Sequence, residues 1–524
     1  MEGATAAGAG GLVPVRRVLP PRPSRFPLAL GLWLAIPVAW SVGDPLEGPR
    51  GRLRATDKWT RAEAVEELAR IGSEEAWELV IGALADPKGE VADTAQLVLA
   101  AVDAPETLER LAGAGGLRSK DAGVRARAAE VWGRLARAPR DEDLERRLAR
   151  ALGDEDAEVR RMAAWSFERR ASLEAGESGG GGKEAVEALE RRARSDRDPL
   201  VRVRALGALV AVDPATARRP VTEACGAREP LLRGAGAAWV GRVLDPGEAL
   251  ARLGALAADQ ESSVRRVAVE ALAELGTRGA FERLVERLEA EPEERLLGRL
   301  VEHLRSVSGL KHKRDPRPWN DWLRGLPTDW KGVARRPEAE DPATATSAVL
   351  AGLPILSKRV TILIDLSGSI WNVRPDGRTR KQAVDAKLRE TLEALPPDTR
   401  FNLIPYTSAP IPWKPRLVPA SPARVREAAA WFEARHENGS GNFWDAALLA
   451  LEDPEVDTLV VLFDGAPTGG TRHRLELIVP LFLERNQARR VAVDLILVDA
   501  SRKLQRLWGG LADGTGGRLL SVSL

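Results

Sequence analysis

The chain has 524 residues, too many for one hydrophobic core, and this length predicts about three domains. Charged residues make up 29% of the chain, but 78 Lys and Arg balance 76 Asp and Glu, and the net charge of +2 argues against a dedicated nucleic-acid binder. A single cysteine, Cys225, excludes an intrachain disulfide and a cysteine-based zinc site, and the four histidines show no paired metal-binding spacing.

The first 43 residues have the features of a targeting segment. Arginines between residues 16 and 25 precede an uncharged apolar run, residues 26–40. As a helix this run would span roughly 22 Å, which is short of the about 30 Å of a bilayer's hydrocarbon core. We therefore predict a signal peptide over residues 1–43, with an uncleaved N-terminal anchor as the alternative. Either would export the rest of the chain to the periplasm, cell envelope or exterior, with membrane contact only through residues 26–40 if they are retained.

A linker over residues 44–57 is expected to precede a long helical region, residues 58–312. Ala, Leu, Arg and Glu recur there at helical spacing, and five segments share an acidic turn, then Val, usually Arg, and a small apolar residue. The valines are Val91, Val124, Val159, Val201 and Val264. Their intervals are 33, 35, 42 and 63 residues, the last close to two repeats. A period in this range indicates a helical solenoid, in which neighbouring helix pairs bury one another.

These segments resemble the HEAT-repeat family, in which Asp-x-x-Val-Arg-x-x-Ala opens the second helix of each pair. In such a helix the Asp can cap the N-terminus, and the Val and Ala face the neighbouring repeat. The Arg can reach acidic groups along the stack. A glycine-rich stretch, residues 176–184, lacks both the preceding strand and the Ser or Thr after Lys183 that a phosphate-binding loop needs. We interpret it as an insertion between two helices.

Residues 313–357 are expected to form a cap and a linker. Prolines interrupt this region, and Trp319, Trp322 and Trp330 lie among them. Because the last repeat of a solenoid needs a cover, we predict that these tryptophans supply it rather than bind a ligand. The polar tract at residues 335–347 is predicted to be the linker itself.

The last region, residues 358–524, alternates apolar strand patterns with helical patterns. Strands separated by helices require parallel pairing, with helices on both faces of the sheet. The sequence therefore predicts an all-α solenoid followed by a doubly wound, Rossmann-like α/β domain. Open sheets of this kind place binding sites at the carboxyl ends of their strands.

The first strand of this domain ends in a cluster of oxygen-bearing side chains. RVTILIDLSGS brings Asp365, Ser367 and Ser369 into one loop directly after a buried strand. Hard cations such as Mg²⁺ prefer oxygen donors of this kind. Ser, Gly and Asp also cluster in ordinary turns, so the spacing alone is only moderately specific.

The whole of 358–524 resembles a von Willebrand factor type A (VWA) domain. The resemblance implies a metal-ion-dependent adhesion site (MIDAS), made by Asp-x-Ser-x-Ser after the first strand, a Thr before a helix and an Asp after the fourth strand. In this chain the matching positions are Asp365, Ser367, Ser369 and Asp464. Gly441 stands where the family has the Thr, and Ser440 could supply a hydroxyl only if its loop shifts.

The resemblance therefore predicts a site for Mg²⁺, or for another divalent cation such as Mn²⁺ or Ca²⁺. Ser367 and Ser369 would bind it directly, and the two aspartates directly or through water. An open coordination position would take an acidic residue of a protein partner. The alternative is a loop kept for its turns, with the metal weak or lost. Trp371 is the candidate for a partner-binding rim, whereas Trp444 and Cys225 are expected in the core.

The function predicted from these features is that of a non-catalytic, exported protein–protein interaction or adhesion scaffold. No Gly-x-Ser-x-Gly elbow follows a strand, and no histidine is close to the two serines of the site in sequence, which argues against an enzyme. One alternative is a structural scaffold whose VWA site is degenerate and metal-free. Another is an adaptor for an AAA+ ATPase, as some VWA domains are, if the N-terminal run does not export the chain.

Overall fold

The computed structural model describes residues 44–102, 104–135, 142–173, 182–332 and 348–522. All the helices and strands given below belong to one compact unit, Pro45–Leu524. The signal peptide or anchor predicted for residues 1–43, most of the glycine-rich stretch and the linker at 335–347 lie outside the described residues. None of the helices in the described ranges is long and apolar enough to span a bilayer.

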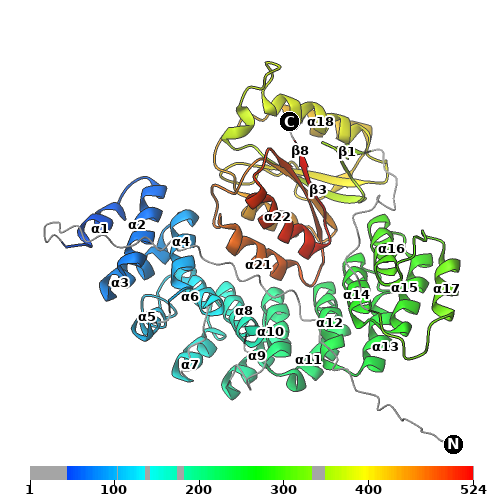
Figure 1. The fold of residues 1–524 in the computed structure, drawn as a ribbon, viewed down its shortest axis with the longest axis horizontal. Helices are drawn as coiled ribbons and strands as arrows, with labels where there is room; N and C mark the ends of the chain where they lie inside the picture. Colours follow the sequence, from blue (N-terminus) through cyan, green and yellow to red (C-terminus); the bar gives the residue numbers. More distant parts are fainter. Residues whose placement is uncertain (1–43, 103, 136–141, 174–181, 333–347, 523–524) are drawn as a thin grey trace, which may run out of the picture. The chain divides into compact units, whose positions relative to one another are not determined.

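Up to residue 324 the described chain is helical, and its helices follow one another in a row (Figure 1). They are α1 (Glu47–Arg52), α2 (Lys58–Ile71), α3 (Glu74–Gly82), α4 (Gly89–Leu99), α5 (Pro105–Leu111), α6 (Ala122–Arg134), α7 (Glu142–Ala151), α8 (Ala157–Leu173), α9 (Lys183–Ser195), α10 (Pro199–Val212), α11 (Pro214–Cys225), α12 (Pro230–Val243), α13 (Pro246–Leu256), α14 (Ser262–Leu275), α15 (Arg278–Ala290), α16 (Glu294–Ser308) and α17 (Pro316–Arg324). Helix α1 lies inside the range expected to be a linker, which is therefore not wholly irregular.

The repeated segments open α4, α6, α8, α10 and α14, and all five of their valines are buried. Where the acidic residue is an Asp at the helix start, it caps the helix: Asp121 accepts from the Val124 N–H at 3.0 Å, and Asp198 accepts from the Leu200 N–H at 2.8 Å. Such caps satisfy amide groups that have no partner within the helix. The predicted second helix of each pair is thus present and starts where the pattern placed it.

A ladder of arginines joins successive repeats. Each guanidinium pairs with a carboxylate 25 to 36 residues further along the chain, at 2.7 to 2.9 Å. The pairs are Arg61 with Asp86, Arg125 with Asp154, Arg160 with Asp196, Arg233 with Asp259, and Arg265 with Glu291. The same guanidiniums donate to backbone carbonyls five and six residues earlier. The planar fork of arginine makes both contacts at once. The expected role of the repeat arginine is confirmed for Arg125, Arg160 and Arg265, whereas Arg202 donates to the Ala193 carbonyl instead.

The tryptophans after the repeats pack on the last helices. Trp319 is fully buried, and the rings of Trp322 and Trp330 lie edge-on to Phe281 of α15 at 6.3 and 5.6 Å between centroids. This packing covers the end of the helical row, as predicted. A small hairpin of β1 (Val349–Leu350) and β2 (Leu353–Pro354) follows, within the range expected to be cap and linker.

The C-terminal domain is built on a six-stranded sheet with the order β5-β4-β3-β6-β7-β8. All neighbours are parallel except β5, an edge strand in a proline-rich segment where no strand was predicted. Because both faces are covered, the central strands are buried along nearly their whole length rather than alternating. The strands are β3 (Arg359–Asp365), β4 (Arg400–Tyr406), β5 (Val418–Pro419), β6 (Thr458–Phe463), β7 (Ala492–Val498) and β8 (Leu519–Val522).

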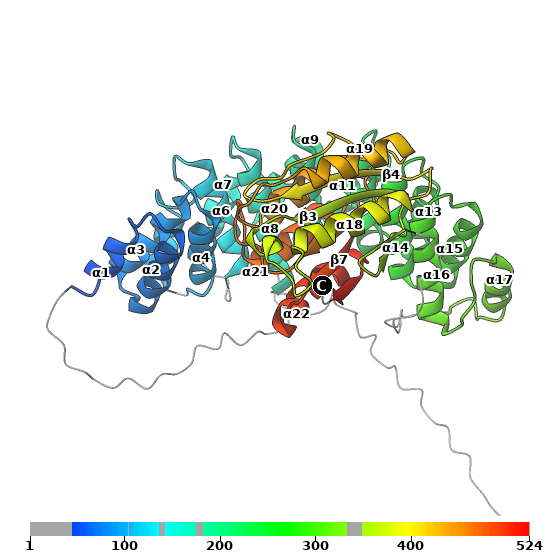
Figure 2. The same cartoon turned by 90° about the horizontal axis from the view of Figure 1, so that it is seen from above.

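Helices cover both faces of this sheet. Helices α18 (Arg380–Glu393) and α19 (Pro422–Glu433) pack against each other on one face (Figure 2). Ile362, Leu388 and Phe432 belong to one buried core on this face. Helices α20 (Phe443–Leu451), α21 (Leu475–Asn486) and α22 (Arg502–Thr515) cover the other face, in a core that is continuous with that of the helical repeats. The doubly wound fold is therefore present as predicted.

Buried ion pairs join the helical repeats to the loop before α21. Asp93 of α4, fully buried, accepts from Arg127 Nη1 at 2.8 Å and from the backbone N–H of His473 at 2.8 Å. Arg472 pairs with Glu130 of α6 and lies 3.7 Å from Asp93. Burial opposes the charge on Asp93, but the contact with His473 and the charges of Arg472 and Arg127 hold its pKa below the usual range.

The same contact continues along α21 and β7. Glu484 of α21 accepts from Arg204 Nε at 2.8 Å and pairs with Arg161. Asp494 of β7 accepts from both Nη atoms of Arg295, at 3.0 and 3.2 Å. Each of these carboxylates is matched by a guanidinium from a different repeat. The contact therefore depends on buried charges that are paired, which is the condition for burying them at all.

Two glycines allow the backbones to approach closely at this contact. A Cβ on Gly89 of α4 would lie 2.5 Å from the carbonyl oxygen of Gly470, and one on Gly234 of α12 would lie 2.2 Å from that of Ala488. Any side chain at these positions would push the sheet domain away from the repeats. The glycines thus belong to the same contact as the ion pairs.

Candidate metal site at the end of strand β3

The predicted MIDAS residues lie together at one edge of the sheet. The Ser367 N–H donates to Asp365 Oδ1 at 2.8 Å, and Ser369 Oγ donates to Asp464 Oδ1 at 2.8 Å. Asp365 ends β3 and Asp464 follows β6, its parallel neighbour, so the two strand ends bring the side chains to the same place. The structure thus brings all four residues together, while their binding of a metal remains a prediction.

Asp365 is unusual because its carboxylate is buried without an ion pair to any described residue. Its side chain is 9% exposed, and among the described residues no Lys, Arg or His forms an ion pair with it. Burial raises the pKa of Asp365 to about 6, and the negative charge of Asp464 adds to this, while hydrogen bonds from Ser367 oppose it. A buried carboxylate without a counter-ion is costly unless it is protonated or meets a cation. The position is therefore suited to cation binding.

The space beside Gly441, where the VWA family has its Thr, is filled. A Cβ on Gly441 would lie 2.7 Å from Asp365 Oδ2, so a side chain there would require the carboxylate to move. The Gly441 N–H donates to Thr468 Oγ1 at 2.8 Å, and the Thr468 N–H donates to the Gly441 carbonyl at 3.0 Å. The glycine is thus fixed in place by the β6–α21 loop, and Asp365 occupies the volume that a Thr would need.

Ser440 packs against the same loop. A Cβ on Gly469 would lie 2.4 Å from Ser440 Cβ and 3.0 Å from its Oγ. The Ser440 N–H donates to Ser408 Oγ at 3.2 Å. The side chain therefore lies on the β6–α21 loop, and its role as a substitute ligand stays a prediction.

Sequence reasoning missed two charged residues of the site. Arg380, the first residue of α18, donates from Nη1 to Asp464 Oδ2 at 3.1 Å and from Nη2 to Asp499 Oδ2 at 2.9 Å. Asp499 follows β7, with a positive φ of 51°. One signal was available, because Asp499 ends an apolar strand just as Asp464 does. No sequence pattern marks Arg380, which pairs with both aspartates, because its position depends on where α18 starts relative to the sheet.

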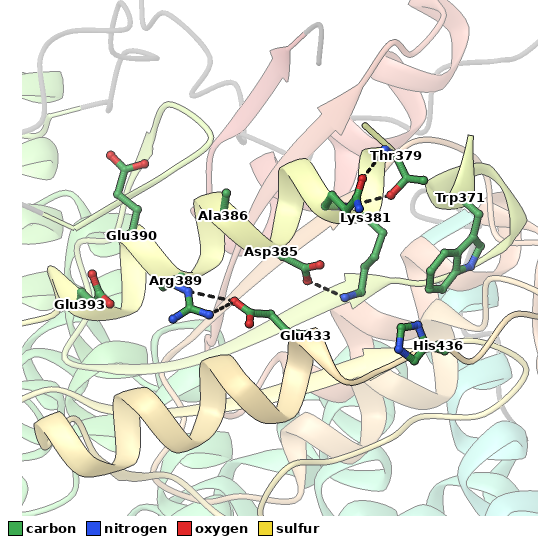
Figure 3. A pocket seen from close by; sticks show the side chains of 11 residues that line it. Trp371, Thr379, Lys381, Asp385, Ala386, Arg389, Glu390, Glu393, Glu433 and His436 are labelled. Atoms are coloured by element: carbon green, nitrogen blue, oxygen red, sulfur yellow. Dashed lines mark hydrogen bonds and ion pairs between the residues drawn. The ribbon is translucent and has the colours of Figure 1, made fainter. Parts of the chain in front are cut away.

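Trp371 lies at one end of an open groove of about 710 Å³ between α18 and α19 (Figure 3). Its ring faces His436 at 6.2 Å between centroids. Other lining residues form ion pairs among themselves, Lys381 with Asp385 and Arg389 with Glu433. Trp371 is half-buried beside the site, so its place fits a rim residue, and its contact with a partner stays a prediction.

Trp444 and Cys225 lie in the core, as expected. Trp444 is 5% exposed and Cys225 is 9% exposed. Burial raises the pKa of the Cys225 thiol to about 11, so it carries no charge near neutral pH.

The donor set indicates which metal the site suits. Among the described residues there is no group of three or more His, Cys, Asp or Glu side chains placed to hold a metal ion. The site instead offers the carboxylates of Asp365 and Asp464 and the hydroxyls of Ser367 and Ser369. Oxygen-only donors with few carboxylates suit a hard cation that keeps some of its waters, as Mg²⁺ does. These residues therefore fit a divalent cation of that class.

Comparison with known proteins agrees with this architecture. Residues 50–130 and 114–210 match the family model of HEAT repeats. Inter-alpha-trypsin inhibitor heavy chain H4 of Bos taurus is 32% identical over 137 residues, 24% of this chain and 14% of that protein. Heavy chain H3 of Bos taurus is 36% identical over 100 residues, 19% of this chain and 10% of that one. The chain thus spans a small part of the length of these relatives.

Solved structures with partial likeness include the SpRpn10 VWA domain, with 18% identity, a TM-score of 0.25, and coverage of 31% of this chain and 87% of that one. The S. pombe condensin Cnd3–Cnd2 subcomplex has 17% identity, a TM-score of 0.35, and coverage of 54% and 38%. These values are too low to indicate a shared function. By its own architecture the protein is an α-solenoid joined to a doubly wound α/β domain. More particularly, residues 50–210 match the model of HEAT repeats, and the C-terminal domain has the doubly wound sheet that the resemblance to VWA domains predicts.

Proposed function

We propose that this protein is an exported, non-catalytic scaffold that captures a protein partner through a divalent-metal site in its VWA domain. HEAT repeats and relatives that contain VWA domains support protein–protein interaction in general terms. The single observation that carries the metal-dependent part is the buried carboxylate of Asp365, which forms no ion pair with any of the described residues. The apolar run of residues 26–40 behind its arginines supports export, with either a cleaved signal peptide or a retained anchor.

In this proposal Ser367 and Ser369 would hold the ion through their hydroxyls, and Asp365 and Asp464 would hold it directly or through water. Ser369 already donates its proton to Asp464, which leaves the lone pairs of its oxygen free to face a cation. The bound ion, Mg²⁺ or a similar divalent cation, supplies a positive centre with an open position for an acidic side chain of the partner. Trp371, beside this position, would add an aromatic contact at the rim.

A second candidate is a structural scaffold whose VWA site works without metal. The pairing of Arg380 with Asp464, together with the missing hydroxyl at Gly441, favours it. In that case the partner would bind through other surfaces, and removal of divalent ions would change nothing.

Metal binding is tested first on the full chain, by thermal unfolding and titration calorimetry with Mg²⁺ after EDTA treatment. We expect Mg²⁺ to raise Tm in the parent protein and to have no effect on Asp365→Ala. Gly465→Ala is the matched control, because its added Cβ would meet no atom within 4 Å although it adjoins Asp464. Parent and Asp365→Ala proteins that melt alike with and without Mg²⁺ would remove the basis of the proposal.

Partner capture is tested next, by pull-down from envelope extract with the same three proteins. We expect a protein that is retained by the parent and by Gly465→Ala in Mg²⁺, released by EDTA, and absent from Asp365→Ala. Retention that persists in EDTA would favour the metal-free scaffold instead.

A further inference from the structure

Arg380 is held rigidly next to the proposed metal site. A capping box fixes the start of α18: Thr379 Oγ1 accepts from the Gln382 N–H at 3.2 Å, and Gln382 Oε1 accepts from the Thr379 N–H at 2.9 Å. The Arg380 N–H also donates to the Asn372 carbonyl at 3.0 Å. The guanidinium therefore projects from a fixed point, and its side chain is 25% exposed.

Both oxygens of Asp464 are already engaged. Oδ1 accepts from Ser369 and Oδ2 accepts from Arg380, while the second Nη of Arg380 holds Asp499. The Ser369 contact is compatible with a bound metal, because a hydroxyl can donate its proton and offer a lone pair at once. The Arg380 contact is different, since a guanidinium has no lone pair to share and brings a positive charge towards the ion.

We propose that Arg380 is a built-in competing cation, which limits divalent-metal binding at this site and so sets the metal concentration at which the partner is captured. The inference rests on the proposed metal-dependent function. Arg380 would compete directly for Asp464 Oδ2, and its positive charge would oppose a cation held through Oδ1 as well, while its second Nη can stay on Asp499. Asp499 thus serves as the place where the guanidinium is kept when the metal is bound.

Arginine suits this bridge better than lysine, because its two Nη atoms reach one carboxylate each. Its planar fork reaches Asp464 and Asp499 together, whereas a lysine ammonium is a single point charge. The neighbouring Arg378 is not part of this arrangement, because it pairs with Asp376 and is 60% exposed. Arg378 is therefore the natural control for a change of charge two residues away.

The experiment measures Mn²⁺ binding to the full chain at fixed ionic strength, by the electron paramagnetic resonance of free Mn²⁺. We expect Arg380→Gln to bind Mn²⁺ about tenfold or more tightly than the parent, because a positive charge near the ion is removed. Arg380→Lys should fall between the two, and Arg378→Gln should stay within about twofold of the parent, since screening weakens exposed charges. Asp365→Ala added to Arg380→Gln should abolish the gain, which identifies the site.

The possible outcomes separate this inference from the function on which it rests. Binding by Arg380→Gln where the parent binds no Mn²⁺ supports the competing role of Arg380, but it overturns metal-dependent capture by the parent protein. Equal or weaker binding by a folded Arg380→Gln overturns the competing role and leaves the metal site standing. If neither the parent nor Arg380→Gln binds Mn²⁺, both the inference and the metal-dependent function are overturned.

Discussion

Asp93, at the contact between the helical repeats and the C-terminal α/β domain, and Asp365, at the edge of the sheet, are both buried, yet their pKa values move in opposite directions. Around Asp93 the contact with His473 and the charges of Arg472 and Arg127 outweigh the cost of burial, and its pKa falls. Around Asp365 no such cations are present among the described residues, and burial raises its pKa to about 6. Burial alone therefore does not determine what a buried carboxylate does; the charges around it decide.

The two environments have different uses. The paired carboxylates Asp93, Glu130 and Glu484 fix the position of one domain on the other, and they leave no charge for a ligand to meet. Asp365 has no cationic partner in the part of the chain that the structure describes, and a cation from solution would balance its charge. The first arrangement is structural and the second is suited to binding. Three changes test this contrast.

The largest effect is expected where a paired charge is broken. Asp93→Ala leaves Arg127 and Arg472 buried without their shared carboxylate, which should lower the free energy of unfolding by about 3–5 kcal/mol. Chemical denaturation of the full chain measures it. Arg218→Ala, which breaks an exposed pair with Glu248, is the control and should change stability by at most about 0.5 kcal/mol. If both variants unfold alike, the network at the contact is not structural.

A somewhat smaller effect of opposite sign is expected at the unpaired carboxylate. The folded-state pKa of Asp365, about 6, lies above its ordinary 3.8, so the stability that its proton contributes is present below pH 4 and lost as pH rises through 6. Asp365→Asn carries no charge at any pH. It should therefore be more stable than the metal-free parent by about 3 kcal/mol at pH 7.5, and by little at pH 4.

Chemical denaturation in EDTA between pH 4 and pH 7.5 measures the difference in the free energy of unfolding between Asp365→Asn and the parent. Mg²⁺ added at pH 7.5 should reduce this difference, because the ion pairs with the parent's carboxylate. A stability difference that stays constant over the whole pH range would show that the charge on Asp365 does not destabilise the folded state. Asp365 would then behave like the ion-paired carboxylates at the contact between the two domains.

The smallest effect is expected from filling the space beside Gly441. Gly441→Ala places a Cβ 2.7 Å from Asp365 Oδ2 and should cost about 1–3 kcal/mol of stability. The cost should largely disappear when Asp365→Ala is also present, because the clashing oxygen is then gone. Unfolding of the two single variants and the double variant measures this coupling, with Gly465→Ala as the control. Equal costs in both backgrounds would mean that the Asp365 carboxylate does not fill this space.

Much of the architecture could be predicted because it follows from local patterns. The Asp-x-x-Val-Arg segments carry both the helix caps and the arginine ladder, so their period was sufficient to find the repeats. The expected irregular ranges were less accurate: α1 lies in residues 44–57, β1 and β2 lie in residues 313–357, and β5 is an edge strand among prolines. Elements of two to six residues carry too few positions to show a period.

The sequence by itself determined the HEAT-like repeats, the doubly wound sheet, and the meeting of Asp365, Ser367, Ser369 and Asp464, because the ends of neighbouring parallel strands lie at one edge. Only the tertiary structure decided that Arg380 joins Asp464 to Asp499, that Asp365 fills the place of a missing Thr, and that Asp93 meets Arg472. Contacts of this kind link residues far apart in the chain. They depend on how whole helices pack on the sheet, and the spacing of residue types along the sequence does not predict that packing.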